Sequence, residues 1–128
     1  MNDLTQARKL IKECQETQNP YLDLGKCGIT DLNELPELFE CKHLETLILS
    51  NELLDGRSWR RSSNDGKDNE ISSIPKEITY LKNLTKLFIG GSILTNTKWK
   101  LSDISFLSNL TRLQYLNLHF NQISDISF

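Results

Sequence analysis

Leucine and isoleucine recur along the chain with a spacing that fits neither a helix nor an ordinary half-buried strand. In LQYLNLHFNQI, residues 113 to 123, leucine stands at positions 113, 116 and 118, followed by asparagine at 121 and isoleucine at 123. A helix would show steps of three and four residues, and a half-buried strand would alternate strictly. The observed steps of three, two, three and two predict a short strand that is followed at once by a turn.

The same spacing occurs four times, in segments that begin at Leu22, Leu44, Leu84 and Leu113. Together they follow the pattern L-x-x-L-x-L-x-x-N/C-x-L. Each segment predicts a strand whose leucines point into the core while the residues between them point outward, because side chains alternate across a strand. Each repeat is expected to form one coil of the chain. A single coil buries only part of its apolar side, so the coils are expected to stack on one another.

The polar position of the repeat follows each predicted strand. Asn121 is expected to be buried at the turn, where its amide can bond backbone groups that the turn leaves unpaired. Cys27 stands at the equivalent position of the first repeat. The pattern resumes at Asn69 and at Trp99 after two interruptions.

Those interruptions are insertions into the second and third repeats. Leu22 and Leu47 are equivalent and 25 residues apart, whereas the next two intervals between repeats are 40 and 29 residues. A repeat needs roughly 22 to 25 residues, so the insertions add about 17 and about 7 residues. We place the insertions near 51–68 and 91–98. Each follows directly after a predicted strand, so both are expected on the same rim of the stacked repeats. The first is rich in Ser, Asn, Asp and Gly, which predicts a loop.

The two ends of the array carry different patterns. Residues 3–17 show apolar side chains at helical spacing, with Asn2 or Asp3 as the N-cap, which predicts an amphipathic helix. We expect residues 1–19 to cap the first coil and residues 20–128 to form about four repeats in a single domain. The chain stops in mid-repeat at ISDISF. This predicts a fragment of a longer protein, with an uncapped last coil through which two copies could dimerise.

These motifs resemble the leucine-rich repeat superfamily over nearly the whole chain from residue 20 onward. LSDISFLSNLTRLQYLNLHFNQISDIS is similar to the repeats of internalin-like bacterial proteins and of phosphatase regulators. ISSIPKEITYLKNLTKLFI is similar to the L-P-x-x-I repeats of bacterial and plant-type proteins. The resemblance implies an α/β leucine-rich repeat solenoid, a right-handed horseshoe with a parallel sheet on its concave side. Family members usually bind partners through that face and the adjoining loops.

Composition and charge narrow the possible functions. The formal net charge of −2 provides no global basic field for nucleic acid or an anionic membrane. No stretch approaches the roughly 20 apolar residues of a membrane span, and the start of the chain lacks the pattern of a signal peptide. With three cysteines, an odd number, the chain is expected to hold reduced thiols and to be cytoplasmic.

No motif for catalysis is recognisable. The sequence contains no G-x-x-x-x-G-K-[ST], no G-x-S-x-G and no H-E-x-x-H. The cysteines lack metal-binding spacing, and His43 and His119 have the character of ordinary surface histidines. We therefore expect a protein that is not an enzyme and that holds no metal and no cofactor.

The outward strand positions predict a binding surface, because equivalent residues of stacked strands form columns. Ile48 and Phe88 should lie exposed at its centre between Tyr21 and Tyr115, and such an apolar centre with a polar rim is typical of partner sites. Alternatively, isoleucine and phenylalanine are simply good strand formers on a partly apolar surface. The candidate residues of the concave face are Tyr21, Asp23, Thr46, Ile48, Lys86, Phe88, Tyr115, Asn117 and His119.

The two insertions contain both tryptophans, each beside basic residues. An exposed Trp-Arg pair is a common interface anchor, whereas the alternative is that the tryptophans fold back and shield the core. The candidate loop residues are Arg57, Trp59, Arg60, Arg61 and Trp99.

Two functions are open at this point. The first is a non-catalytic module that binds a protein partner, and neither nucleic acid nor membrane, through the concave face and the rim loops. The second is a regulatory or sensor segment of a larger signalling protein, because the chain stops abruptly at Phe128. The expected N-terminal helix followed by YLDLGKCGITDL also resembles the start of repeat regions in bacterial multidomain proteins, some of which precede a Ras-like GTPase module. In that case the catalytic domain lies outside this chain.

Overall fold

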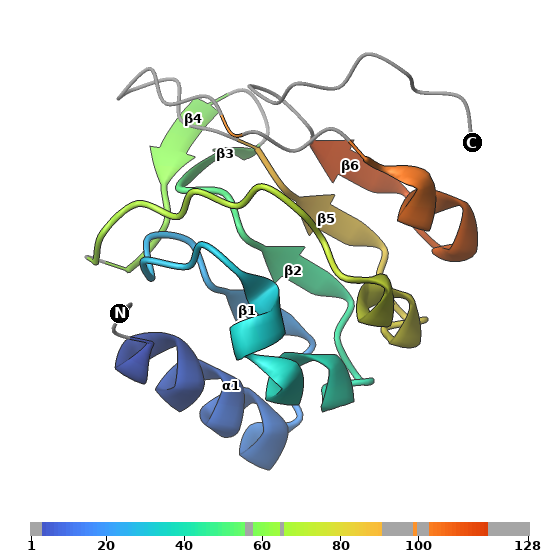
Figure 1. The fold of residues 1–128 in the computed structure, drawn as a ribbon, viewed down its shortest axis with the longest axis horizontal. Coiled ribbons are helices and arrows are strands. Elements are labelled where there is room, and N and C mark those ends of the chain that lie inside the picture. Colours follow the sequence, from blue (N-terminus) through green and yellow to red (C-terminus); the bar gives the residue numbers. More distant parts are fainter. Residues whose placement is uncertain (1–3, 56–57, 65, 91–98, 100–102, 118–128) are drawn as a thin grey trace.

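The centre of the molecule is a sheet of four short parallel strands (Figure 1). The computed structural model describes residues 4–55, 58–64, 66–90, 99 and 103–117, with only the backbone described for 53–55 and 58–60. The strands lie side by side in chain order, so each coil neighbours the next. They are β1 (Tyr21–Asp23), β2 (Thr46–Ile48), β5 (Lys86–Phe88) and β6 (Tyr115–Asn117).

The register of the strands is the one that the repeat predicts. Leu22 lies opposite Leu47, Leu47 opposite Leu87, and Leu87 opposite Leu116. Main-chain bonds between coils continue past the strand ends, as when the Leu24 N–H donates to the Ile48 carbonyl at 2.8 Å. Stacking therefore satisfies backbone groups that an isolated coil would leave unpaired.

Short 3₁₀ helices return the chain from one strand to the next. A 3₁₀ turn rises steeply per residue and suits a return of only a few residues. Pro36 stands in the first turn of its helix, where the missing N–H has no intrahelical role. The helices are η1 (Leu32–Glu34), η2 (Pro36–Glu40), η3 (Lys76–Tyr80) and η4 (Ser105–Asn109).

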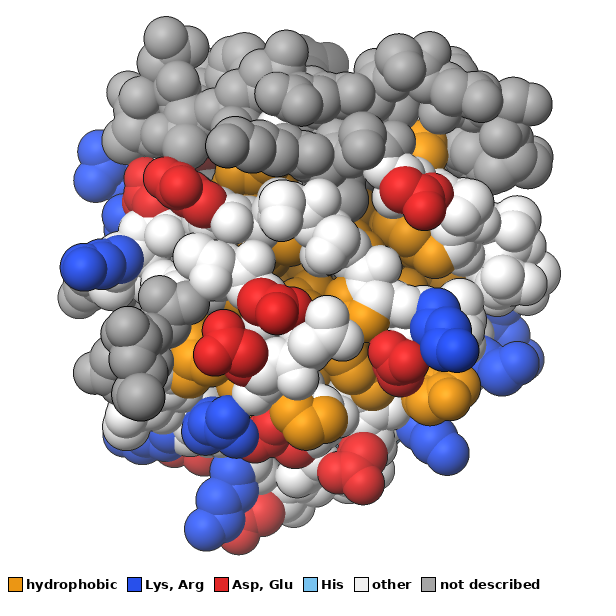
Figure 2. Space-filling model, viewed as in Figure 1, with side chains coloured by type: hydrophobic (Ala, Val, Ile, Leu, Met, Phe, Trp, Pro, Cys, Tyr) orange, Lys and Arg blue, Asp and Glu red, His pale blue; other side chains and the backbone are white. Residues whose placement is uncertain are grey.

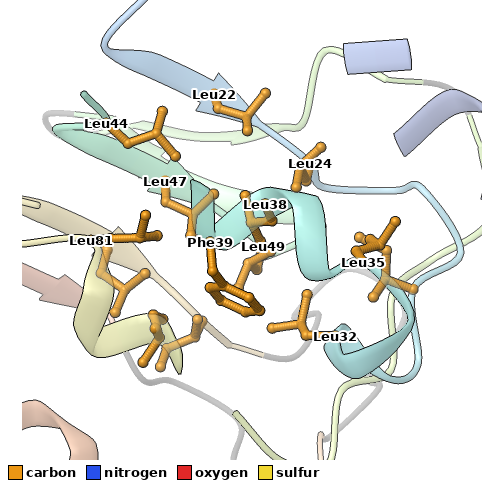
Figure 3. Close-up of a cluster of buried hydrophobic side chains, with 14 of the residues drawn as sticks. Leu22, Leu24, Leu32, Leu35, Leu38, Phe39, Leu44, Leu47, Leu49 and Leu81 are labelled. Atoms are coloured by element: carbon orange, nitrogen blue, oxygen red, sulfur yellow. The ribbon is translucent and has the colours of Figure 1, made fainter. Parts of the chain in front are cut away.

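The hydrophobic core fills the space between the strands and the 3₁₀ helices. Figure 3 shows leucines of the strand segments and of the 3₁₀ segments pointing toward one another, with the Phe39 ring among them. Leu38, Leu47 and Leu49 are fully buried, each at 0% exposure. All the buried hydrophobic side chains of the described residues except Ile48 and Phe88 form one cluster that extends from Leu4 to Leu110, so one main core runs through the stacked coils.

The predicted N-terminal helix is present as α1 (Thr5–Thr17), and it packs beside β1 (Figure 1). Its buried side chains are Ala7, Ile11 and Cys14, which confirms the apolar side that the sequence indicated. The helix starts later than expected, with Leu4 in the N-cap position, and the proposed caps at residues 2 and 3 lie outside the described residues. Its role as a cap, the domain limits and the horseshoe curvature stay predictions.

None of the helices in the described segments has the length and apolar character that a membrane crossing requires.

The first insertion differs from its prediction, because it contains a β-hairpin and not only a loop. β3 (Glu52–Asp55) pairs antiparallel with β4 (Ser58–Arg61), and two residues separate the strands. The two residues between the strands in the sequence are Gly-Arg at 56–57, and glycine in the first place of a two-residue connection is a hairpin signal. The polar composition that predicted a loop belongs mainly to the segment after the hairpin, SSNDGKD. The second insertion at 91–98 and the last coil at 118–128, including Asn121, lie outside the described residues.

Candidate interaction surface on the parallel sheet

The outward side chains of the parallel sheet form two rows, as the sequence predicted. The start row contains the first residue of each strand, namely Tyr21, Thr46, Lys86 and Tyr115. The end row contains the third residue of each strand, namely Asp23, Ile48, Phe88 and Asn117. Both rows face the same side of the sheet, since positions two residues apart share a face.

The start row faces solvent. Tyr21 is 42% exposed and Tyr115 is 37% exposed, which places them among the most exposed large hydrophobic side chains of the described residues. Lys86 is exposed between them, and Thr46 is half-buried. These four side chains are accessible to a partner.

The end row is covered, and the prediction of an exposed apolar centre at Ile48 and Phe88 is wrong. Ile48 is 0% exposed and Phe88 is 6% exposed. The two form an apolar cluster of their own, separate from the main core, and the Phe88 ring lies 5.1 Å from that of Tyr115. Asn117 is half-buried. Alternation placed these residues on the outer side correctly, but it does not tell whether that side is covered.

Asp23 is not available to a partner, because its carboxylate holds the end of the first insertion. Its Oδ1 accepts hydrogen bonds from the Ser62 hydroxyl at 2.7 Å and from the Gly25 N–H at 2.9 Å. Its Oδ2 accepts from the N–H of Ser63 at 3.2 Å and from the Ser63 hydroxyl at 3.3 Å. Asp23 is only 8% exposed, so the prediction that it contacts a partner is replaced by an internal role.

Asn64 and Gly25 complete this attachment, which we call the Asp23 latch (Asp23, Gly25 and 62–64). The Asn64 amide donates to the carbonyls of Asp23 and Gly25, both at 2.9 Å. A Cβ on Gly25 would lie 2.2 Å from the Ser50 carbonyl oxygen and 2.7 Å from the Ser62 Cβ. Glycine is therefore required for the close approach of the insertion to the first coil.

Asn69 shows what the asparagine of the repeat does. Its Oδ1 accepts from the N–H groups of Cys27 at 3.1 Å and Ile29 at 2.7 Å. Its side-chain amide donates to the carbonyls of Leu24 at 2.8 Å and Leu49 at 2.9 Å. Asn69 is fully buried, and these four bonds use the whole hydrogen-bonding capacity of its side chain. One asparagine thus joins the first and second coils at the point where the insertion ends.

Asn51 closes the insertion at its other end. Its Oδ1 accepts from the Asn69 N–H at 2.7 Å and from the Lys26 N–H at 3.2 Å. Its side-chain amide donates to the Asn69 carbonyl at 3.1 Å. Asn51 and Asn69 therefore bring the two ends of the insertion together. Sequence reasoning overlooked Asn51, although its place directly after a strand was a usable signal.

Trp99 is buried, and its prediction as an exposed loop anchor is wrong. It is 1% exposed, and its indole N–H donates to the Asn69 carbonyl at 2.9 Å. The alternative, that the tryptophan shields the core, holds for this residue. Trp99 stands at the asparagine position of the third repeat, and its N–H makes a bond from that position to the coil before.

The other loop candidates are only partly described. Arg61 is exposed at the end of β4. Trp59 and Arg60 lie on β4 with Trp59 opposite Leu54, but their side chains, like all of Arg57 and His119, lie outside the described residues. Binding through these residues stays a prediction.

The described residues offer little for catalysis. They contain no group of three or more His, Cys, Asp or Glu placed to hold a metal ion. The Cys14 Sγ lies 3.3 Å from Nε2 of His43, yet burial raises the pKa of the Cys14 thiol. Burial also raises the pKa of Cys41 to about 11, and burial together with the nearby Asp23 raises that of Cys27 to about 12. A reactive cysteine needs a lowered pKa, so these thiols have the character of core residues.

Known proteins that are similar to this chain include a curated relative and a solved structure. Ras suppressor protein 1 from Bos taurus is 28% identical over 80 residues, which cover 62% of this chain and 23% of that protein. The chain thus spans less than a quarter of that relative. Internalin C2 from Listeria monocytogenes is 19% identical, with 92% of this chain and 65% of that chain covered, but the TM-score of 0.33 is too low to establish a common fold. No family model matches the chain.

The comparison with Ras suppressor protein 1 supports an assignment of the chain to the leucine-rich repeat superfamily. The chain's own repeats, the parallel strands in matching register and the buried Asn69 define this class, and Ras suppressor protein 1 is a leucine-rich repeat protein. Such relatives are protein-interaction modules, which is consistent with a non-catalytic binding role for this chain.

Proposed function

We propose that the chain is a non-catalytic interaction module that binds a protein partner through the start row of its sheet. The observation that carries the proposal is the exposure of Tyr21 and Tyr115, 42% and 37%, at the two ends of a row with Lys86 and Thr46 between them. Tyrosine gives a large contact area and a polar hydroxyl at a low cost in side-chain entropy, and it is enriched at the energetic centres of interfaces.

Hydrogen bonds between the coils hold the backbone beneath the start row. The N–H groups of Glu45 and Thr46 donate to the Pro20 carbonyl at 2.8 and 2.9 Å, and those of Thr85 and Lys86 donate to the Glu45 carbonyl at 2.8 and 3.0 Å. The N–H groups of Gln114 and Tyr115 make the same pair of hydrogen bonds to the Thr85 carbonyl. The outward side chains are therefore presented at the regular spacing of neighbouring strands, about 4.8 Å. A preorganised surface loses less entropy on binding.

The residues just before the start row widen the accessible surface. Pro20, Glu45 and Gln114 are exposed beside it, and Thr85 is half-buried. With Glu45 and Lys86 the surface carries both signs of charge, so it suits a mixed protein surface better than a polyanion. This revises the predicted site, because the centre moves from Ile48 and Phe88 to the start row.

The test is a comparison of proteins captured from a native lysate by the wild-type chain and by two variants. The first variant, Tyr21→Ala with Tyr115→Ala, removes both tyrosines of the start row. The second, Lys12→Ala, is a control, because Lys12 is an exposed residue of α1 outside the start row. All three are first shown to be folded by circular dichroism.

We expect a partner that the wild type and Lys12→Ala both retain and that the double variant loses by tenfold or more. A partner that binds the double variant as well as it binds the wild type would contradict the proposal. The captured protein would then have to contact another surface of the chain.

A further inference from the structure

We propose that a groove on the side of the 3₁₀ helices binds a lysine- or arginine-bearing segment of a protein partner, independently of the start row. The core separates this side from the sheet. The groove lies between η2 and η3 and has a volume of about 590 Å³. Its principal lining residues are Pro36, Glu37, Phe39, Glu40, Glu77 and Tyr80.

The stacking of the coils explains why these side chains meet. η2 (Pro36–Glu40) and η3 (Lys76–Tyr80) are five-residue helices of consecutive repeats, and they contact each other. Glu40 and Tyr80 are the last residues of the two helices, and Glu37 and Glu77 are the second. Equivalent positions of stacked repeats lie side by side, so the groove acquires carboxylates along its length and a tyrosine at one end.

The groove carries uncompensated negative charge. Arg8 also lines it, but its guanidinium is already used, because Nη1 pairs with Glu37 Oε2 and Nη2 donates to the Glu34 carbonyl at 2.7 Å. Within the described part of the chain, the carboxylates of Glu40 and Glu77 form no ion pair. The second oxygen of Glu37, Oε1, accepts no hydrogen bond from these residues either. A basic side chain would supply the missing positive charge.

The groove also has an apolar component. Tyr80 is the most exposed large hydrophobic side chain of the described residues, at 53%, and Phe39 is 5% exposed. Figure 2 shows both carboxylate and basic side chains beside patches of hydrophobic side chains on the face turned to the viewer. Lysine and arginine place their aliphatic stems along apolar surface and keep their charge at its edge. Their cations also bind the face of a tyrosine ring.

These features together favour a basic segment over an acidic or a wholly apolar one. Tyr80 also lines a second groove of about 590 Å³ between η3 and η4, which contains Asp103 and Phe106. Hydrogen bonds from Ser105 lower the pKa of Asp103, so that carboxylate is charged at neutral pH. Lys76 lines this second groove as well and offsets its charge, so the first groove is the site of the proposal.

The proposal can be tested with a labelled probe peptide. The probe has nine residues, alternately lysine and alanine, and the reference peptide has glutamine in place of lysine. Fluorescence polarisation measures the binding of both peptides to the complete 128-residue chain at low ionic strength. The groove variant is Glu40→Gln with Glu77→Gln. The matched control is Glu13→Gln with Glu16→Gln, which removes the same charge from exposed residues of α1.

We expect the lysine probe to bind the wild type more tightly than the glutamine peptide does. The groove variant should bind the lysine probe roughly five- to tenfold more weakly, because two charge pairs near the surface are lost. Tyr80→Ala should weaken binding by about threefold. The Glu13/Glu16 control should stay within about twofold of the wild type.

Three results would overturn the proposal: equal binding of the two peptides, equal affinities of the groove variant and the wild type, or an equal loss in the control. The last result would mean that the probe responds only to diffuse charge. The Tyr21/Tyr115 double variant should bind the lysine probe normally. The experiment therefore tests the groove independently of the start row.

Discussion

Two rows of side chains lie on the same face of the same four strands, yet one row is much more exposed to solvent than the other. Lys86 in the start row is exposed, whereas Phe88, two residues later on the same strand, is 6% exposed. Tyr21 is 42% exposed, whereas Asp23 is 8% exposed and bonded to Ser62. The alternation of the strand is the same in both rows, so it cannot explain the difference.

The difference at β1 comes from the insertion that follows β2. Residues 62–64 return to the first coil and bind Asp23 and Gly25, about 40 residues earlier in the chain. The start row lies at the other end of the strands and keeps its exposure. A sequence pattern therefore assigns a residue to one side of a sheet, while a distant segment decides whether that side remains open.

The largest expected effect is a loss of stability caused by Asn69→Ala, which removes the side chain that joins the first and second coils. The change leaves two buried N–H groups and two buried carbonyls without their partner, and each such group costs about 1–3 kcal/mol. We expect the free energy of unfolding to fall by at least about 3 kcal/mol in urea denaturation followed by circular dichroism. Asn109→Ala, an exposed asparagine of η4, is the control and should change it by less than about 0.5 kcal/mol. A loss below about 1 kcal/mol at Asn69 would show that the asparagine does not join the coils.

A smaller effect is expected when the Asp23 latch is weakened by Asp23→Asn. The amide keeps one acceptor oxygen but cannot accept from both Ser62 and Ser63, so about 1–2 kcal/mol of stability should be lost. Hydrogen exchange of residues 62–64 should become faster, while exchange around Leu87 in the core should change much less. Unchanged exchange of residues 62–64 would mean that the carboxylate does not hold the insertion.

The smallest effect is one of pH and involves Cys27, beside the end row. Burial and Asp23 raise the pKa of its thiol from 9.0 to about 12 in the folded protein. The folded state therefore favours the neutral thiol, and this contribution is fully present below pH 9 and lost as the pH rises toward 12. We expect the free energy of unfolding to fall more between pH 7.5 and pH 10 in the wild type than in Cys27→Ala. Equal losses would show that the thiol is not protected by burial.

Much of the scaffold could be predicted from the sequence, because local spacing determines it. The leucines at 22, 47, 87 and 116 define both the register and the inner side of the sheet. Asn69 and Trp99 mark the points where the repeat resumes. The glycine at 56, first of the two residues between the hairpin strands, also signals the hairpin, although the polar residues after the hairpin favoured a loop.

The accessible surface was harder to predict, because it depends on contacts between distant segments. The burial of Ile48 and the bonds of Asp23 become visible only in three dimensions. Trp99 gave conflicting signals, since tryptophan beside lysine is typical of an interface while its place in the repeat indicates the core. The groove at Tyr80 was overlooked because its residues come from different coils, although ITYLKNL contains an aromatic residue at an outward position.

The central claim, that the start row is open and the end row closed, can be tested most directly by thiol labelling. Cysteine would be introduced separately by Lys86→Cys and Ile48→Cys, and the rate of reaction with a maleimide measured under native conditions and in urea. The native cysteines are buried and add little background. We predict that Lys86→Cys reacts almost as fast in the native state as in urea, and that Ile48→Cys reacts at least about 100-fold more slowly in the native state. Equal native rates at the two positions would contradict the account.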